Sequence, residues 1–198
     1  MRRLILASTS KYRRELLARL GMPFDTAAPG VDETPLAGEA PRERARRLAG
    51  AKARSLQVAD AVVIGSDQVA SLDGTVLRKP GGPAAALRQL QAAQGNAVLF
   101  HTAVTVLDTA TAEEWSHVDL TEVRFARLPS AALERYLEID APFDCAGSFK
   151  SEGLGVALFE RVESTDPTAL IGLPLIWLAA TLRSAGLDPL GLRGPRAP

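Results

Sequence analysis

Arg13 and Arg14 are two cations in an unfavourable place, the first turn of a predicted helix. Ser10 is the expected N-cap of that helix, because its hydroxyl oxygen can accept a hydrogen bond from an early helix amide. Cations at this end oppose the helix dipole, at a cost of roughly 0.3–1 kcal/mol each. The arrangement is useful if an anion binds there, because amides, hydroxyls and guanidinium groups then all donate to it. A basic surface helix in water is the alternative interpretation.

Lys52 is a cation on what should be the apolar face of a helix from Pro41 to about Leu56. It lies at helical spacing from Leu48 and from Leu56. A lysine at such a position either extends to the edge of the core or meets an anion. The pattern favours the anion, because nearly every other cation of this helix is an arginine.

Asp67 follows an apolar run, Ala61–Ile64, that is typical of a strand covered on both faces. Ligands collect beyond the carboxyl ends of strands in open α/β sheets, so Asp67 is expected to project a carboxylate into such a crevice. Gly65 would let the backbone come close to the ligand. Because Val69–Leu72 continues as a strand, Asp67 interrupts an extended run, which favours a functional role over that of an ordinary turn residue.

Two further segments carry carboxylates that could take part in a site. Asp32 and Glu33 are adjacent, and neighbouring side chains on an extended segment point to opposite sides. We therefore do not expect them to act as a matched pair; one of them reaches a cation, or both lie in a solvated turn. Residues 144–153 carry Lys150 and Glu152 among small residues, a composition that suits either close approach of the backbone to a ligand or a simple loop.

The composition limits the class of protein. A chain of 198 residues predicts one domain, with room for two lobes, that buries roughly 70% of its unfolded surface. Its 23 basic residues balance 23 acidic ones, so no overall field points to nucleic acid or to an anionic membrane. Cys145 is the single cysteine, which excludes an internal disulfide and a multi-thiolate zinc site and fits a cytoplasmic location. It is interpreted as a packing residue.

No membrane-spanning segment is predicted, because no apolar run reaches the ~20 residues that a span needs. The N-terminus does not resemble a secretory signal, since it lacks a long apolar segment. Residues 187–198 are rich in Gly, Pro and Arg, and we expect them to form a loose tail after a domain that covers residues 1–186.

The predicted elements alternate between helices and strands. Proline marks the expected start of four helices, at Pro41, Pro83, Pro129 and Pro174, where its missing amide is harmless. Asp73-Gly74 is a strong signal for a two-residue hairpin. Two long strands, 98–107 and about 115–128, are expected to pair, and a last strand is expected over 154–162. The order of elements indicates an α/β fold.

Several well-known catalytic patterns are absent from the chain. There is no P-loop, no HExxH, no GxSxG and no EF-hand pattern, and the GxG at Gly153–Gly155 is not completed at Leu158. The candidate residues that remain are the two arginines at the start of a helix, the lysines Lys52 and Lys79, and the carboxylates of Glu33, Asp67 and Glu152. Cations for a polyphosphate, with carboxylates for a metal ion and a water, are what hydrolysis of a phosphoanhydride requires.

The chain resembles the Maf family of nucleoside triphosphate pyrophosphatases over nearly its whole length. The resemblance rests on Leu6–Ser10 followed by two arginines, Val31–Thr34, Ile64–Val69, Lys79-Pro80 and Gly172–Pro174. The segment Cys145–Gly153 resembles the 7-methyl-GTP branch of the family and differs from the glycine- and glutamine-rich segment of the branch that acts on dTTP and UTP. Two positions differ from the family pattern. Tyr12 stands where the nearest member of the 7-methyl-GTP branch has Trp, and Arg78 stands where many family members have Gly before Lys-Pro.

The resemblance implies an elongated mixed β-sheet flanked by helices, with two lobes and a central cleft. It implies a nucleoside triphosphate substrate, a divalent metal cation (Mg²⁺ or Mn²⁺) and a homodimer. By the same resemblance Asp67 is the proton acceptor, and Tyr12, Gln68 and Glu152 determine specificity. The phosphate- and metal-binding residues implied in this way are Ser8, Ser10, Arg13, Arg14, Glu33, Lys52 and Lys79.

These two lines of reasoning predict that the protein hydrolyses 7-methyl-GTP to the monophosphate and pyrophosphate. Arg13, Arg14, Lys52 and Lys79 would hold the charge that grows on the leaving group. Glu33, and with it Asp67, would hold the metal ion, and Asp67 would deprotonate the attacking water. Two other hypotheses remain at this point: a dTTP and UTP pyrophosphatase, and a nucleotide-binding regulator of septum formation with little turnover.

Overall fold

The sheet is mixed, and three strands of twelve residues each form its centre. The computed structural model describes residues 2–191, and the strand order is β2-β1-β3-β5-β6-β7, with β4 paired to β3. β1 runs parallel to β2 and β3, and all the other pairs are antiparallel. The strands are β1 (Arg3–Ala7), β2 (Asp25–Ala27), β3 (Ala61–Leu72), β4 (Thr75–Leu77), β5 (Ala97–Asp108), β6 (Glu114–Phe125) and β7 (Phe159–Glu163).

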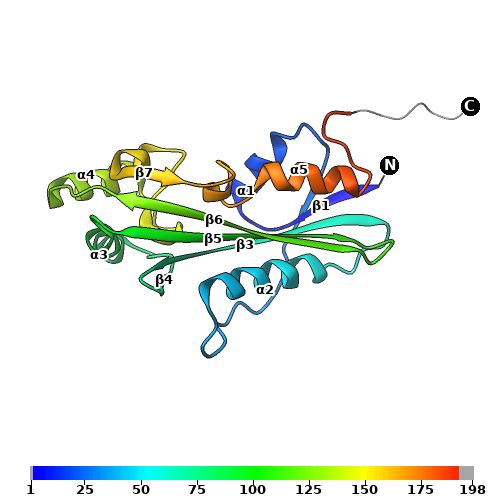
Figure 1. Ribbon diagram of the computed structural model, residues 1–198, viewed down its shortest axis with the longest axis horizontal. Coiled ribbons are helices and arrows are strands. Elements are labelled where there is room, and N and C mark those ends of the chain that lie inside the picture. The colour runs from blue at the N-terminus through cyan, green and yellow to red at the C-terminus, as the bar shows by residue number, and fades with distance from the viewer. Residues whose placement is uncertain (1, 192–198) are drawn as a thin grey trace, which may run out of the picture.

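Helices cover both faces of this sheet. They are α1 (Lys11–Ala18), α2 (Pro41–Arg54), α3 (Pro83–Ala93), α4 (Ser130–Asp140) and α5 (Leu175–Ser184), with three short 3₁₀ turns, η1 (Ala146–Ser148), η2 (Leu154–Leu158) and η3 (Ala169–Ile171). Figure 1 shows an elongated molecule in which α2 lies on one face and α1 and α5 lie on the other, while α3, α4 and β7 gather at one end. The predicted α/β architecture with an elongated mixed sheet is therefore confirmed.

Of the four apolar clusters in the described residues, the two largest form two cores along the length of the sheet. One packs α1 and α5 onto the N-terminal half of β3, through residues such as Leu17, Ile64 and Leu178. The other packs α3, α4 and the segment around Phe149 onto the opposite end of β5 and β6. Each core defines one lobe, and β3, β5 and β6 belong to both.

β3 differs from its prediction in a way that matters for the site. Asp67 neither ends nor interrupts a strand, but lies in the middle of one continuous strand, opposite Ala103 of β5. The strand continues because β5 pairs with it along its whole length, whereas its parallel partner β1 ends at Ala7. Asp67 therefore lies just past the carboxyl end of β1, beside the loop that leads into α1.

Gly65 allows a helix, and not a ligand, to approach the backbone. A Cβ atom at this position would lie 2.2 Å from the carbonyl oxygen of Ala49 and 2.4 Å from the amide nitrogen of Ala53, both in α2. The absence of a side chain at Gly65 thus sets how close α2 comes to β3. This distance also sets how far Lys52 of α2 reaches across the strand.

Replacing Gly65 with alanine is expected to lower the free energy of unfolding by about 1–3 kcal/mol, the usual cost of overpacking, because α2 must move away from β3. Urea denaturation measures this loss. Gly82→Ala is the control, since a Cβ there meets nothing within 4 Å. Equal stability of the Gly65→Ala variant and the parent protein would show that α2 is not held at this distance by Gly65.

Three other predictions are corrected by the structure. The segment predicted as a strand over 154–162 begins as the 3₁₀ turn η2, and β7 starts only at Phe159. Pro41 and Pro83 occupy the first helical position as expected, but Pro129 and Pro174 are the N-cap residues of their helices. Leu187, placed in the predicted loose tail, is buried in the core beside α5, and positions 192–198 of that tail lie outside the described residues.

Candidate functional site

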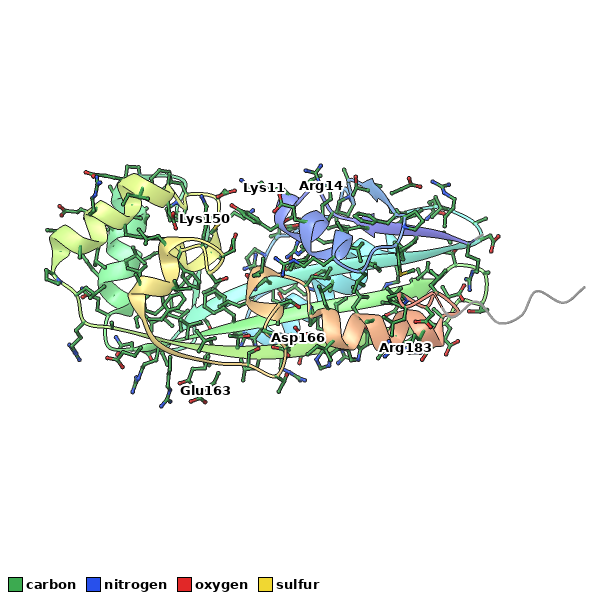
Figure 2. All side chains as sticks on the ribbon, turned by 90° about the horizontal axis from the view of Figure 1, so that it is seen from above. Lys11, Arg14, Lys150, Glu163, Asp166 and Arg183 are labelled. Atoms are coloured by element: carbon green, nitrogen blue, oxygen red, sulfur yellow. The ribbon has the colours of Figure 1, made fainter. Side chains whose placement is uncertain are left out.

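A cavity of about 700 Å³ opens between the two lobes, at the point where β1 ends and β3 continues. Its walls come from the loop between β1 and α1, from α2, from the middle of β3 and from residues 144–152. Every residue predicted for the site lines this cavity except Arg14. Figure 2 shows Arg14 at the outer edge of α1 and Lys11 nearer the lobe that carries Lys150. Arg14 is exposed, so the structure does not bring it to the predicted phosphate site.

Lys52 forms the charged centre of the cavity. It is buried, and its Nζ lies 2.7 Å from Oδ1 of Asp67 and 2.7 Å from Oε1 of Glu33. The two carboxylate oxygens are thus no more than twice that distance apart. Burial by itself raises the pKa of Glu33, but the hydrogen bond from Lys52 and the positive charges of Lys52, Lys79 and Arg13 lower that pKa overall. Of the two alternatives left open for Asp32 and Glu33, the structure shows the first: Glu33 reaches the cation Lys52, whereas Asp32 accepts hydrogen bonds from Thr34.

The loop between β1 and α1 presents hydroxyls and one guanidinium group to the cavity. Ser10 is the N-cap of α1, and its Oγ accepts a hydrogen bond from the amide of Arg13 at 3.4 Å. Ser8 is buried, and its Oγ accepts from the amide of Ser10 at 3.1 Å. Arg13 Nε donates to the carbonyl oxygen of Gly172 at 3.0 Å. Burial lowers the pKa of Arg13, while the negative charges of Asp67 and Glu33 act in the opposite direction.

Gln68 acts as a structural clamp on the segment that faces Arg13. Its Nε2 donates to the carbonyl oxygens of Ala169 and Leu170, at 3.1 and 3.0 Å, and lies 2.9 Å from the hydroxyl of Thr102. Ser66, on the same side of β3, donates to Gly172 at 2.9 Å. Because both amide hydrogens of Gln68 are engaged within the protein, only its carbonyl oxygen is available to a ligand.

An aromatic ring, a thiol and two carboxylates gather at the far end of the cavity. The hydroxyl of Tyr12 lies 3.5 Å from Oδ2 of Asp144 and 3.7 Å from the sulfur of Cys145. Glu152 lines the same wall and is exposed. Cys145, predicted as a packing residue, is only half-buried and forms part of the cavity. Burial is the main cause that raises its pKa to about 11, and the negative charges of Asp144 and Glu152 raise it further.

Cys145 is expected to react slowly with iodoacetamide in the folded protein. With a pKa of about 11, against 9.0 for an ordinary thiol, its thiolate fraction at pH 8 is about 100-fold lower than in the unfolded chain. Its alkylation rate should therefore rise about tenfold per pH unit across neutral pH, and the rate in urea should exceed the native rate. The measurement is mass spectrometry of alkylated protein against time. A native rate equal to that in urea would contradict the raised pKa.

The Maf-like protein family matches residues 3–185 of the sequence, which is nearly all of the described chain. The chain belongs to the Maf family. Among its Maf relatives, a protein of Xanthomonas oryzae pv. oryzae (strain MAFF 311018) named 7-methyl-GTP pyrophosphatase is 56% identical over 188 residues, which are 94% of this chain and 98% of the relative. A Paraburkholderia xenovorans (strain LB400) protein of the same name is 55% identical over 195 residues, 96% of this chain and 95% of the relative.

Among solved structures, a HAM1 protein from Coxiella burnetii is similar to part of the chain. It has a TM-score of 0.46 and 15% identity, and it covers 65% of this chain and 75% of its own.

The divalent metal ion implied by the Maf resemblance fits the cavity only together with a substrate. No group of three or more His, Cys, Asp or Glu side chains that could hold a metal ion occurs within residues 2–191. Glu33 and Asp67 are two carboxylates close together, and both already contact Lys52. Mg²⁺ commonly binds one or two carboxylates and completes its shell with waters and substrate phosphates. The pair is therefore sufficient for a metal that arrives with a polyphosphate.

The cavity also contains residues that the sequence pattern did not single out. Arg44 of α2 lines it and donates from Nη2 to the backbone carbonyl of Glu33 at 3.1 Å, which ties the loop of Glu33 to the helix. Helical spacing carries a signal for Arg44, since residues eight positions apart, such as Arg44 and Lys52, lie on the same side of a helix. Asp144 carries no such signal, because its contact with Tyr12 joins positions that are 132 residues apart.

Proposed function

We propose that this Maf protein is a nucleoside triphosphate pyrophosphatase that hydrolyses 7-methyl-GTP to 7-methyl-GMP and pyrophosphate. The proposal is supported above all by one observation: a buried lysine holds two carboxylates at the centre of a cleft that has cationic residues at one end and an aromatic ring at the other. The relatives that carry the name 7-methyl-GTP pyrophosphatase cover almost the whole chain at more than half identity.

The reaction assigns a role to each end of the cavity. A water oxygen attacks the α-phosphorus, the bond from that phosphorus to the bridging oxygen breaks, and pyrophosphate leaves with the bonding electrons. Asp67 takes the proton from the attacking water. Arg13, Lys52 and Lys79 bind the β- and γ-phosphates and stabilise the negative charge that grows on them. The guanine ring lies against Tyr12, beside Glu152 and the free carbonyl of Gln68.

Lys52 has to serve both the carboxylates and the phosphates in this scheme. Without substrate its ammonium group contacts both Asp67 and Glu33 and offsets part of their combined charge. When a triphosphate enters, its oxygens compete for the same ammonium group, which frees Oδ1 of Asp67 to accept a hydrogen bond from the attacking water. Glu33 and Asp67 would hold the Mg²⁺ or Mn²⁺ ion, which supplies charge neutralisation at the phosphate oxygens.

A panel of nucleotides tests the proposal. Pyrophosphate release is measured with 7-methyl-GTP, GTP, dTTP and UTP in the presence of Mg²⁺ or Mn²⁺, and 7-methyl-GTP is expected to give the highest kcat/KM. A higher value with dTTP or UTP would overturn the choice of substrate. Tight nucleotide binding without release of pyrophosphate under any of these conditions would instead support a regulatory protein.

Two further properties remain predictions: a homodimer, from the family resemblance, and a cytoplasmic location, from the single cysteine. No helix within residues 2–191 is long and apolar enough to cross a membrane.

A further inference from the structure

The end of the cavity that holds Tyr12 carries two carboxylates, and only one of them, Glu152, was predicted as a specificity position. Asp144 and Glu152 both line this end and both are exposed. Neither takes part in an ion pair within the described residues. At the phosphate site of the same cavity, the cations Arg13, Lys52 and Lys79 surround two carboxylates, Glu33 and Asp67. Three cations accompany two carboxylates there, whereas one cation, Lys11, accompanies Asp144 and Glu152 beside Tyr12, so these two groups of residues carry net charges of opposite sign.

The end of the cavity beside Tyr12 is the mouth of the cleft, because Asp144 and Glu152 are exposed there. Contacts to both of its carboxylate oxygens hold Asp144 in this place. The hydroxyl of Tyr12 lies 3.5 Å from Oδ2, and the sulfur of Cys145 lies 3.5 Å from Oδ1. Both contacts are long, so a ligand with stronger donors or a positive charge can replace them at little cost. Tyr12 belongs to α1 and Asp144 to the segment after α4, so the pair joins the two lobes across the mouth.

A cation of the chain itself already occupies the face of the Tyr12 ring. The ammonium group of Lys11 lies 4.8 Å from the ring centroid, within the range of a cation–π interaction. Lys11 lines the cavity as well. The charges of Asp144 and Glu152 also act on the groups beside them, since both raise the pKa of the Cys145 thiol in addition to burial. An aromatic face flanked by two carboxylates is thus a place that attracts positive charge.

We propose that Asp144 is a specificity-determining residue that selects a positively charged purine ring, and that Lys11 holds the place of this ring until the substrate binds. This inference rests on the proposed function, because a guanine methylated at N7 carries the positive charge that the mouth of the cleft favours. The ring stacks on Tyr12, displaces the Lys11 ammonium group, and lies beside the carboxylates of Asp144 and Glu152. Unmethylated guanine has nearly the same shape but lacks the positive charge, so its binding is stabilised less by these carboxylates.

The test compares a charged and an uncharged base on the same variants. The kcat/KM ratio for 7-methyl-GTP over GTP is measured for the parent protein and for Asp144→Asn, which keeps the shape and removes the charge. We expect the ratio to fall about five- to tenfold, the size of a single charge interaction near a surface. Asp73→Asn is the control and should leave the ratio unchanged, because Asp73 is an exposed residue in the turn between β3 and β4 and does not line the cavity. An unchanged ratio in Asp144→Asn would overturn the proposal.

Lys11→Ala tests the second half of the inference. Removal of the competing ammonium group should raise the affinity for 7-methyl-GMP about threefold relative to GMP. Isothermal titration calorimetry measures both affinities without turnover, so the inference is tested even if hydrolysis fails. A Lys11→Ala variant that loses affinity for both nucleotides equally would show that Lys11 binds phosphate instead, and would overturn its proposed role. Failure of the parent protein to release pyrophosphate from 7-methyl-GTP counts against the proposed function alone.

Discussion

Asp67→Asn is expected to lower kcat for pyrophosphate release by about 10²–10⁴-fold, the usual contribution of a general base. The amide oxygen of asparagine can still accept the hydrogen bond from Lys52, which now spans 2.7 Å, so the cavity should keep its shape. What the variant loses is a group that can take a proton from water. The dissociation constant for 7-methyl-GTP should therefore change much less than kcat.

Asp119→Asn is the matched control for this variant. Asp119 is also buried, lies on a central strand and accepts hydrogen bonds from the hydroxyls of Ser164 and Thr165, but it is not part of the cavity. Its loss is expected to cost stability and to leave kcat of the folded protein close to that of the parent. If Asp67→Asn released pyrophosphate at the parent rate, the assignment of Asp67 as proton acceptor would be wrong.

Lys52→Met should impair both activity and stability. Without the ammonium group, Asp67 is a buried carboxylate with no cation in contact, and Glu33 lies close by with the same charge. Breaking a buried pair in this way costs about 3 kcal/mol at neutral pH, towards the low end of the usual range because Glu33 is partly exposed. Loss of a cation that stabilises the leaving group should also lower kcat/KM by about 10²–10³-fold.

The stability loss in Lys52→Met should shrink as the pH falls. In the parent protein the pKa of Glu33 is lowered, so the stability that its ion pair contributes is present above the unfolded pKa and is lost as the pH falls through the folded one. Urea denaturation from pH 7 to about pH 3 measures the difference, because the folded pKa of Glu33 lies below the ordinary value of 4.5. Arg46→Met, which removes an exposed cation of the same helix, is the control. A difference that did not depend on pH would show that packing of the lysine stem, and not its charge, causes the loss.

Patterns within single elements predicted much of this architecture. Ser10 as the N-cap, Lys52 on the buried face of α2 and the Asp73-Gly74 turn each depend on residues a few positions apart, and the structure confirms all three. The sequence alone misjudged Gly65, because its neighbour in space is a helix that comes earlier in the chain. It also placed Asp67 at a strand break, because the pairing with β5 that extends β3 joins residues 36 positions apart.

The residues of the candidate site also divide into those that could be predicted from the sequence and those that only the tertiary structure brings together. Glu33, Lys52 and Asp67 were predicted as members of one site from their chemistry and from the family resemblance, and the structure brings them into contact. Arg14 belongs to the same sequence motif as Arg13, but a step of one residue along a helix turns its side chain out of the cavity. Asp144 could not have been predicted, since only the packing of the two lobes places it beside Tyr12.

The three long strands that run through both lobes also bear on how the molecule unfolds. Since β3, β5 and β6 carry side chains of both apolar cores, neither core can come apart without releasing strands on which the other depends. Calorimetric unfolding should therefore show a single cooperative transition, with equal calorimetric and van't Hoff enthalpies. The same continuity leaves no loop between the lobes in these strands to serve as a hinge, so the nucleotide meets a cleft whose width is largely set by the twist of the sheet.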